Sequence, residues 1–468
     1  MHKINYHQYA VNYIIFSLQQ PRFTQSSRIK FLCLPTGRRF RLLQPFKFSF
    51  LFFIFMIMHT TIAITANTQH YLHLEEKYGA HNYHPLPVVL NRGEGVFLYD
   101  VDGKRYYDFL SGYSAVNQGH CHPKIIAALI EQAQKLTLTS RAFHSNLLGE
   151  YEKYITEYFG YDKVLPMNSG VEAVETAIKL CRKWAYEVKG ISADNAKIIV
   201  CDGNFHGRTI NVISFSSDPT AKNNYGPFVA GYHSIPHNNL PALEKALQDK
   251  NVAAFLFEPI QGEAGVVVPD AGYFKGVRNL CNEYNVLMVA DEIQCGLART
   301  GKMLACDHEN VRPDMLILGK ALSGGVLPVS AVLCDDEIMM TIKPGEHGST
   351  YGGNPLACAV AITALQVLKD EHMAANAEKM GNLLRSEIQK LNSPFISIVR
   401  GMGLLNAIVI KHTNPDAAWE LCLLLKENGL LAKPTHGDKI RFAPPLVITK
   451  EQVMECVGII DKSLKELV

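Results

Sequence analysis

The sequence lacks the patterns that mark several large classes of protein. Its 11 cysteines are spread over 468 residues and never form a C-x-x-C pair, whereas a secreted disulfide framework is usually short and dense in cysteine. The most apolar stretch, residues 49–58, is too short for a membrane-spanning helix, which needs roughly 20 residues. Basic residues exceed acidic ones by only two, so no polyanion-binding surface is indicated. We therefore expect reduced thiols, and a folded body that binds neither nucleic acid nor a membrane.

Two short motifs look like ligand sites but lack the residues that would complete them. His120, Cys121 and His122 are of metal-ligating types, yet no second pair of ligands follows at a distance. Gly401 and Gly403 begin like a dinucleotide fingerprint, but the third glycine is missing and the predicted strand follows instead of preceding them. We expect no metal site and no NAD, and we interpret the first motif as a turn before a helix.

The first 74 residues contain no Asp or Glu, but they hold eight of the 46 Lys and Arg residues. We predict that residues 1–58 are an extension outside the folded body. Three origins stay open: a true start of translation at Met56 or Met58, an organelle transit segment, and a membrane anchor. The expected location is the cytoplasm, with the mitochondrial matrix as the alternative if the extension is a transit segment.

From about residue 71 onward, apolar runs alternate with helical patterns. Continuous apolar runs predict strands that are buried on both faces of a mainly parallel sheet, at residues 198–201, 253–257, 286–290 and 315–318. A hairpin is predicted from residues 96–100 and 105–108, a helix from residues 123–133, a long helical stretch from 355 to about 391, and strands near 404–410 and 440–443. The predicted fold is α/β: an N-terminal arm (59–113), a large domain whose mainly parallel sheet is flanked by helices (114–360), and a smaller α+β C-terminal domain (361–468).

Two polar residues end neighbouring predicted strands. Asp291 follows the run 286–290, and Lys320 follows the run 315–318 by two positions. Ligands collect at the carboxyl ends of strands in parallel sheets, and a buried charge is costly unless it is paired or used. A functional site and a simple buried ion pair between Asp291 and Lys320 both explain this pattern.

Three further motifs favour a functional site. Ser169, Gly170 and Val171 begin a predicted helix, where free backbone N–H groups suit a phosphate. Phe205 and Arg208, in N-F-H-G-R, offer an aromatic face and a guanidinium group. Residues 347–355 form a loop that bears hydroxyl groups before a helix. An anion-binding helix N-terminus, an aromatic ring that can stack, a carboxylate and a lysine together indicate pyridoxal 5′-phosphate. This cofactor has a phosphate, a flat ring and an aldehyde that condenses with lysine.

These motifs carry a family resemblance. The segments N-S-G-V-E-A (168–173), N-F-H-G-R (204–208), E-P-I-Q-G-E-A-G-V (258–266), D-E-I-Q-C-G (291–296), G-K-A-L-S-G-G (319–325) and G-S-T-Y-G-G-N-P (348–355) resemble the class III aminotransferases of fold type I. Within that family, residues 71–468 resemble the branch that acts on ornithine. The segments Y-G-A-H-N-Y-H-P-L-P (78–87) and K-P-T-H-G (433–437) match that branch closely.

The resemblance implies a role for each cofactor residue. Lys320 would bind the cofactor covalently and move protons, while Asp291 would keep the ring nitrogen protonated. Gln294 would contact the ring hydroxyl, Phe205 would stack on the ring, and Ser169, Gly170 and Val171 would form the phosphate seat. Thr350 would reach the phosphate of a neighbouring subunit, which implies a homodimer or a higher homo-oligomer. Glu258 has either a cofactor contact or a bracing role at the strand end. His206 departs from the aromatic pair expected of close relatives.

The substrate residues are implied in the same way. Arg441 resembles the family's α-carboxylate anchor, and Glu263 resembles the group that neutralises it when ornithine binds. Tyr83, Tyr113 and Arg208 resemble the contacts that select ornithine. The implied reaction converts L-ornithine and 2-oxoglutarate into L-glutamate 5-semialdehyde and L-glutamate, in proline and arginine metabolism. The alternatives are a related aminotransferase for acetylornithine or 4-aminobutyrate and, more remotely, a non-catalytic protein of the same fold.

Overall fold

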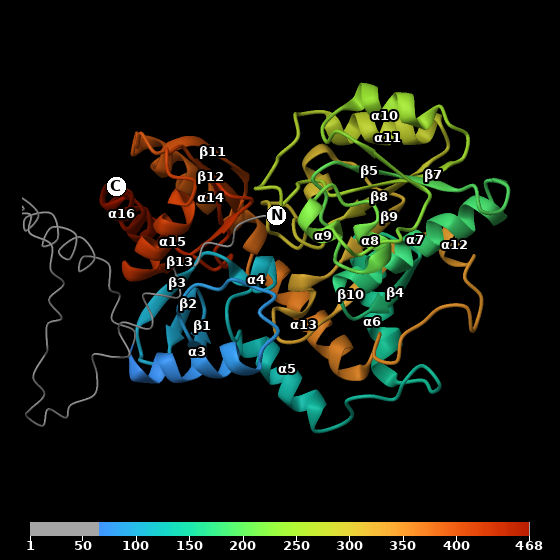
Figure 1. Ribbon diagram of the computed structural model, residues 1–468. Helices are drawn as coiled ribbons and strands as arrows, with labels where there is room; N and C mark the ends of the chain where they lie inside the picture. Colours follow the sequence, from blue (N-terminus) through green and yellow to red (C-terminus); the bar gives the residue numbers. More distant parts are fainter. Residues whose placement is uncertain (1–64, 468) are drawn as a thin grey trace, which may run out of the picture. The chain divides into compact units, whose positions relative to one another are not determined.

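The computed structural model in Figure 1 describes residues 65–467. The predictions for residues 1–58 fall outside this part of the chain. Among the described residues, no helix has the length and apolar character needed to cross a membrane. All ten described cysteines are free thiols.

A seven-stranded sheet forms the centre of the fold. Its continuous apolar strands are buried, and their order is β4 (Lys163–Met167), β10 (Ser330–Cys334), β9 (Met315–Leu318), β8 (Leu287–Asp291), β7 (Val252–Phe257), β5 (Lys197–Cys201) and β6 (Tyr232–Ile235). Neighbours are parallel from β9 through to β6, whereas β10 runs antiparallel to both β9 and β4. The four predicted strands are confirmed as β5, β7, β8 and β9 to within one residue at each end.

Helices cover both faces of this sheet (Figure 1). Helix α7 packs its apolar side on one face, and α10 and α11 pack on the other. The predicted helix α5 begins and ends as expected, and it starts directly after His122, which confirms a turn before a helix. The helices of the first half of the chain are α3 (Ala66–Tyr78), α4 (Ser111–Ser114), α5 (Pro123–Ala133), α6 (Asn146–Phe159), α7 (Gly170–Glu187), α8 (Ile210–Ile213), α9 (Pro219–Lys222) and α10 (Leu240–Leu247).

The remaining helices follow in the second half of the chain. They are α11 (Tyr273–Glu283), the 3₁₀ turns η1 (Ala305–Glu309) and η2 (Lys320–Ser323), α12 (Asp336–Met339), α13 (Pro355–Asp370), α14 (Met373–Lys390), α15 (Ala417–Glu427) and α16 (Lys450–Glu466). The helical stretch predicted from 355 to 391 is two helices, because His372 has left-handed backbone angles (φ 51°) and separates α13 from α14.

The fold contains two further sheets, each of four strands, among the described residues. The first contains the predicted hairpin and is ordered β1 (Leu90–Glu94), β2 (Phe97–Asp100), β3 (Arg105–Asp108) and β13 (Leu430–Leu431). The second is ordered β11 (Ile396–Met402), β12 (Leu405–Ile410), β15 (Lys439–Phe442) and β14 (Lys433–Thr435). The parallel pairing of β13 with β3 was not predicted, and it joins residues 430–431 to residues 107–108. The proposed division into arm, large domain and small domain stays a prediction.

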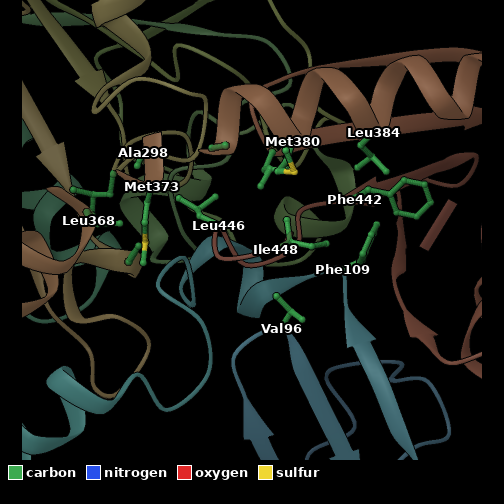
Figure 2. Packing of buried hydrophobic residues seen from close by; sticks show 14 of the residues in the cluster. Val96, Phe109, Ala298, Leu368, Met373, Met380, Leu384, Phe442, Leu446 and Ile448 are labelled. Carbon is green, nitrogen blue, oxygen red and sulfur yellow. The ribbon is translucent and has the colours of Figure 1, made fainter. Parts of the chain in front are cut away.

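A large apolar cluster packs the N-terminal hairpin against the C-terminal segment. Figure 2 shows Val96 and Phe109 facing Phe442, Leu446 and Ile448, below helix α14. The rings of Phe109 and Phe442 meet edge to face, with centroids 5.5 Å apart, an arrangement that contributes about 0.5–1.5 kcal/mol beyond burial. This contact holds the chain just before α4 against the end of β15.

Candidate active site

A cavity of about 190 Å³ lies at the carboxyl ends of β8 and β9, where the topology of the sheet predicts a ligand. It brings together seven of the predicted cofactor residues. Its lining consists of Gly170, Val171, Phe205, His206, Gly207, Glu258, Asp291, Ile293, Gln294 and Lys320.

Lys320 is the first residue of η2, directly after β9 and Gly319. Among residues 65–467, it is the only lysine that lines the cavity. Burial lowers the pKa of its ammonium group and Arg441 lowers it further, while the carboxylates of Glu263, Asp291 and Glu258 act in the opposite direction. A lowered pKa increases the fraction of free amine, which is the nucleophilic form.

The alternative of a direct ion pair between Lys320 and Asp291 is wrong. Among the described residues, no oxygen of Asp291 lies within 4.0 Å of the Lys320 ammonium nitrogen, and Asp291 pairs with His206 instead. Nδ1 of His206 lies 2.6 Å from Oδ2 of Asp291, and the N–H of Ile293 donates to Oδ1 at 3.1 Å. Lys320 is therefore left for other chemistry.

His206 is fully buried beside the Asp291 carboxylate. Burial acts to lower its pKa, but the hydrogen bond and the charge of Asp291 outweigh burial and raise it. Its Nε2 atom is buried without a hydrogen-bond partner among the described residues. Sequence reasoning assigned no role to His206, although its place next to Phe205 was a usable signal.

The N-terminus of α7 forms an anion seat that is smaller than predicted. Ser169 is the N-cap residue, and its own N–H donates to Oε2 of Glu172 at 2.9 Å within a capping box. The prediction of a free N–H at Ser169 is therefore wrong, because Glu172 accepts that hydrogen bond. The N–H groups of Gly170 and Val171 belong to the first turn and have no acceptor within residues 65–467. These two remain available for a phosphate.

Glycine at position 207 allows a close approach to this seat. A Cβ atom there would lie 2.5 Å from Cγ2 of Val171, and the φ of Gly207 is 122°, which side chains rarely adopt. Phe205 and Gly207 thereby stay close to the N-terminus of α7, with the Phe205 ring lining the same cavity.

Glu258 braces the loop that carries Phe205. Its Oε1 accepts the N–H of Phe205 at 2.8 Å, and its Oε2 accepts the N–H of Gly262 at 3.4 Å. Burial raises the pKa of Glu258 to about 7, with the neighbouring charge of His206 acting to lower it. The geometry supports the bracing role, and the same side chain also lines the cavity.

Glu263, Gln294 and Arg441 form one network, in which Gln294 lines the cofactor cavity and Glu263 lines an adjoining one. Nη1 of Arg441 donates to Oε1 of Glu263 at 2.7 Å and to Oε1 of Gln294 at 3.1 Å. Nε2 of Gln294 donates to the same Glu263 oxygen at 3.1 Å. Burial acts to raise the pKa of Glu263, but the charge and hydrogen bond of Arg441 lower it. Arg441 is only 2% exposed, so its ion pair with Glu263 is shielded from water.

The other predicted substrate residues lie farther out. Arg208 stands over the Phe205 ring, 5.5 Å from its centroid, and lines an adjoining cavity of about 300 Å³ together with Glu263. Tyr113 lies beneath the Arg441 guanidinium, which is 5.1 Å from the ring centroid. Tyr83 is 67% exposed and shares with Tyr113 a separate, largely apolar cavity of about 520 Å³. The structure thus brings Tyr113 and Arg208 to the site, and leaves Tyr83 at its periphery.

Thr350 lies on the surface of the subunit, outside these cavities. The loop that carries it is tied to the anion seat, because Nδ2 of Asn168 donates to Oγ of Ser349 at 2.8 Å. A contact of Thr350 with a cofactor phosphate therefore requires a second subunit, and it stays a prediction.

Tyr113 is carried by an unusual turn. All four residues of α4 have left-handed backbone angles, with φ of 49°, 55°, 59° and 70° from Ser111 to Ser114. Only Gly112 adopts these angles without strain, and each of the other three costs roughly 1–2 kcal/mol. Tertiary contacts must hold such a turn, because local preference opposes it.

The cavity residues fit pyridoxal 5′-phosphate. The two unpartnered N–H groups of α7 suit its phosphate, the Phe205 ring suits its aromatic face, the Asp291 carboxylate suits a protonated ring nitrogen, and the amine of Lys320 suits its aldehyde.

Comparisons with known proteins agree with this fit. The family model described as aminotransferase class III matches residues 78–464. A mitochondrial ornithine aminotransferase of Rattus norvegicus is 65% identical over 390 residues, which are 83% of this chain and 89% of the relative. The crystal structure of the ornithine aminotransferase from Toxoplasma gondii is 49% identical with a TM-score of 0.84, and the match covers 86% of this chain and 96% of that one. A structure named acetylornithine aminotransferase, from Elizabethkingia anophelis, is 61% identical with a TM-score of 0.79, covering 86% and 100%.

Proposed function

Since the chain belongs to the class III aminotransferase family of pyridoxal 5′-phosphate enzymes, we propose that it transfers the δ-amino group of L-ornithine to 2-oxoglutarate. The products are L-glutamate 5-semialdehyde and L-glutamate. The observation that carries this substrate choice is the Glu263–Arg441 ion pair, which is bonded to Gln294 of the cofactor cavity. Both substrates are small molecules, and one site must receive a terminal amine in one half-reaction and an α-amine in the other.

Bound pyridoxal 5′-phosphate supplies an aldehyde that condenses with amines and a ring that accepts electrons when a proton leaves the neighbouring carbon. In our proposal, the N–H groups of Gly170 and Val171 would hold its phosphate, and Phe205 would stack on its ring. Asp291 would keep the ring nitrogen protonated, and Gln294 would contact the ring hydroxyl. Lys320 would be the amine that holds the cofactor covalently, and its free amine would serve as the general base and acid that moves the proton.

The Glu263–Arg441 pair accounts for the two substrate orientations. While Arg441 is paired at 2.7 Å, its charge is neutralised and does not attract the carboxylate of ornithine. Ornithine then enters with its δ-amine toward Lys320 and its carboxylate toward Arg208. Glutamate brings an α-carboxylate that competes with Glu263 for Arg441, so that its α-amine lies toward Lys320.

Paired half-reactions test this proposal. Purified protein is expected to be yellow, and L-ornithine is expected to bleach that colour at least about 10-fold faster than N-acetylornithine or 4-aminobutyrate. The reason is that an acylated or missing α-amine leaves polar groups of the site unpaired. Stopped-flow absorbance measures each rate, and o-aminobenzaldehyde detects the cyclised semialdehyde. A preference for N-acetylornithine would assign the chain to the activity named for its Elizabethkingia relative.

Glu263→Ala is expected to change the balance between the two half-reactions. Without its partner, Arg441 is free to bind α-carboxylates, so kcat/KM for glutamate should rise relative to kcat/KM for ornithine by about 10-fold or more. Single-turnover kinetics with each substrate gives this ratio. Glu150→Ala, which removes an exposed carboxylate of α6 that lines neither of these cavities, is the control and should leave the ratio unchanged. An unchanged ratio in Glu263→Ala would contradict the switch.

The assembly and the compartment are proposals as well. A homodimer is supported by the exposed position of Thr350 and by a cavity of about 430 Å³ that opens beside Lys320, Ser169 and Gly170, which a second subunit can close. The word mitochondrial in the name of the rat relative supports the matrix over the cytoplasm for this chain.

A further inference from the structure

The buried carboxylate of Asp108 accepts hydrogen bonds from the backbone where the left-handed turn α4 begins. Oδ1 of Asp108 accepts the N–H groups of Leu110 and Ser111, each at 2.8 Å. Its other oxygen, Oδ2, lies 2.7 Å from Nε2 of His120. Asp108 is 3% exposed, so these bonds are shielded from water and hold the chain where it enters the turn.

A second bond ties the turn to the strand that carries Arg441. Oγ of Ser111 donates to the carbonyl oxygen of Ala443 at 2.7 Å, and Ser111 is completely buried. In the opposite direction, the N–H of Ala443 donates to the carbonyl oxygen of Phe109 at 2.8 Å. Ala443 is two residues beyond Arg441, and the ring of its neighbour Phe442 meets the ring of Phe109 edge to face (Figure 2). The turn and the arginine are thus held as one unit.

Tyr113 is the residue that this unit presents to the substrate site. Its ring lies 5.1 Å from the Arg441 guanidinium, and a cation over an aromatic face is stabilised. Burial raises the pKa of the Tyr113 phenol, and the charge of Glu263 raises it further, while the charge of Arg441 acts in the opposite direction. A relaxed turn with right-handed angles would point the Tyr113 side chain elsewhere.

We infer that Asp108 and Ser111 are positioning residues for substrate selection. They hold α4 in its strained conformation, so that Tyr113 stays against the Glu263–Arg441 pair in the arrangement that admits ornithine. This inference rests on the proposed function, because it concerns the orientation of ornithine in the same site. Neither residue contacts the cofactor cavity itself.

Ser111→Ala tests the inference because it removes the bond to Ala443 while the strain remains. We expect kcat/KM for ornithine to fall about 10-fold through KM, while the glutamate half-reaction changes less than about threefold. Ser114→Ala is the matched control, since Ser114 is also buried in the turn with a φ of 70° but makes no side-chain hydrogen bond within residues 65–467. It should leave both half-reactions unchanged.

A double-mutant cycle separates positioning from general stability. In a Tyr113→Ala background, Ser111→Ala should have no further effect on the ornithine-to-glutamate ratio, because its effect passes through Tyr113. Ser111→Gly, which accepts left-handed angles freely, gives a second test if the alanine variant folds poorly, and it should shift the ratio in the same direction. Thermal melting of each holoenzyme verifies that the folded state is intact.

The outcomes distinguish the two proposals. If the unaltered protein does not turn over ornithine, the proposed function is overturned. If it does, and Ser111→Ala lowers both half-reactions equally or adds fully to Tyr113→Ala, the positioning role of Ser111 is overturned while the proposed function stands.

Discussion

Lys320→Ala is expected to reduce the rate of transamination by at least about 10⁴-fold, the largest effect of any single substitution in this protein. Within the described part of the chain, this side chain is the only lysine amine of the cavity, and both covalent attachment of the cofactor and proton transfer depend on it in our proposal. Single-turnover kinetics with ornithine measures the loss. In the unaltered protein, borohydride reduction followed by peptide mapping should locate the cofactor on Lys320.

Lys369→Ala provides the control for this experiment. Lys369 is exposed near the end of α13, so its removal should change neither the colour of the protein nor its rate. A residual rate within about 10-fold of the unaltered protein, or a reduced cofactor attached to another lysine, would contradict the role of Lys320.

Asp291→Asn is expected to lower kcat by about 10³-fold with a much smaller change in the affinity for ornithine. An amide has nearly the same shape as the carboxylate but does not hold a proton on the ring nitrogen by charge. The lost interaction therefore acts mainly when the ring accepts electrons, which is the chemical step. Stopped-flow measurement of each half-reaction gives kcat and KM separately, and Asp370→Asn, at the exposed end of α13, is the matched control.

His206→Phe separates the charge of Asp291 from its placement. This substitution keeps the carboxylate but removes the ring nitrogen that lies 2.6 Å from it. We expect a loss of about 10-fold in kcat and weaker retention of pyridoxal 5′-phosphate during dialysis, a readout that does not depend on turnover. An effect of His206→Phe as large as that of Asp291→Asn would mean that placement, and not charge, is the main contribution of Asp291.

The central sheet and most of its ligand-binding edge were predictable from sequence for a physical reason. Strands buried on both faces must be apolar throughout, so the charged residues that follow them stand out. Asp291 and Lys320 were recognised in this way, and the structure places both in one cavity. The antiparallel pairing of β10 with β9 and β4 was not predicted, because the composition of an apolar strand says nothing about which neighbours it pairs with.

The contacts that sequence reasoning missed depend on side-chain geometry across long separations. The capping box at Ser169 was visible in the spacing to Glu172, and this signal could have shown that the Ser169 N–H was already used. The partner of Asp291 could not be found in this way, since His206 is 85 residues away. The turn at Ser111–Ser114 has a single glycine as its local signal, and contacts from residue 443 decide its conformation.

The parallel pairing of β13 with β3 has a consequence for the order in which the enzyme is made. Residues 430–431 complete a sheet that begins at residue 90, so this part of the molecule has a very high contact order. As the chain leaves the ribosome, Lys320 and the strands around it emerge more than a hundred residues before the segment that orders the N-terminal hairpin. A nascent chain can therefore assemble its chemical centre first, and it acquires the ability to choose between amines only near the end of synthesis.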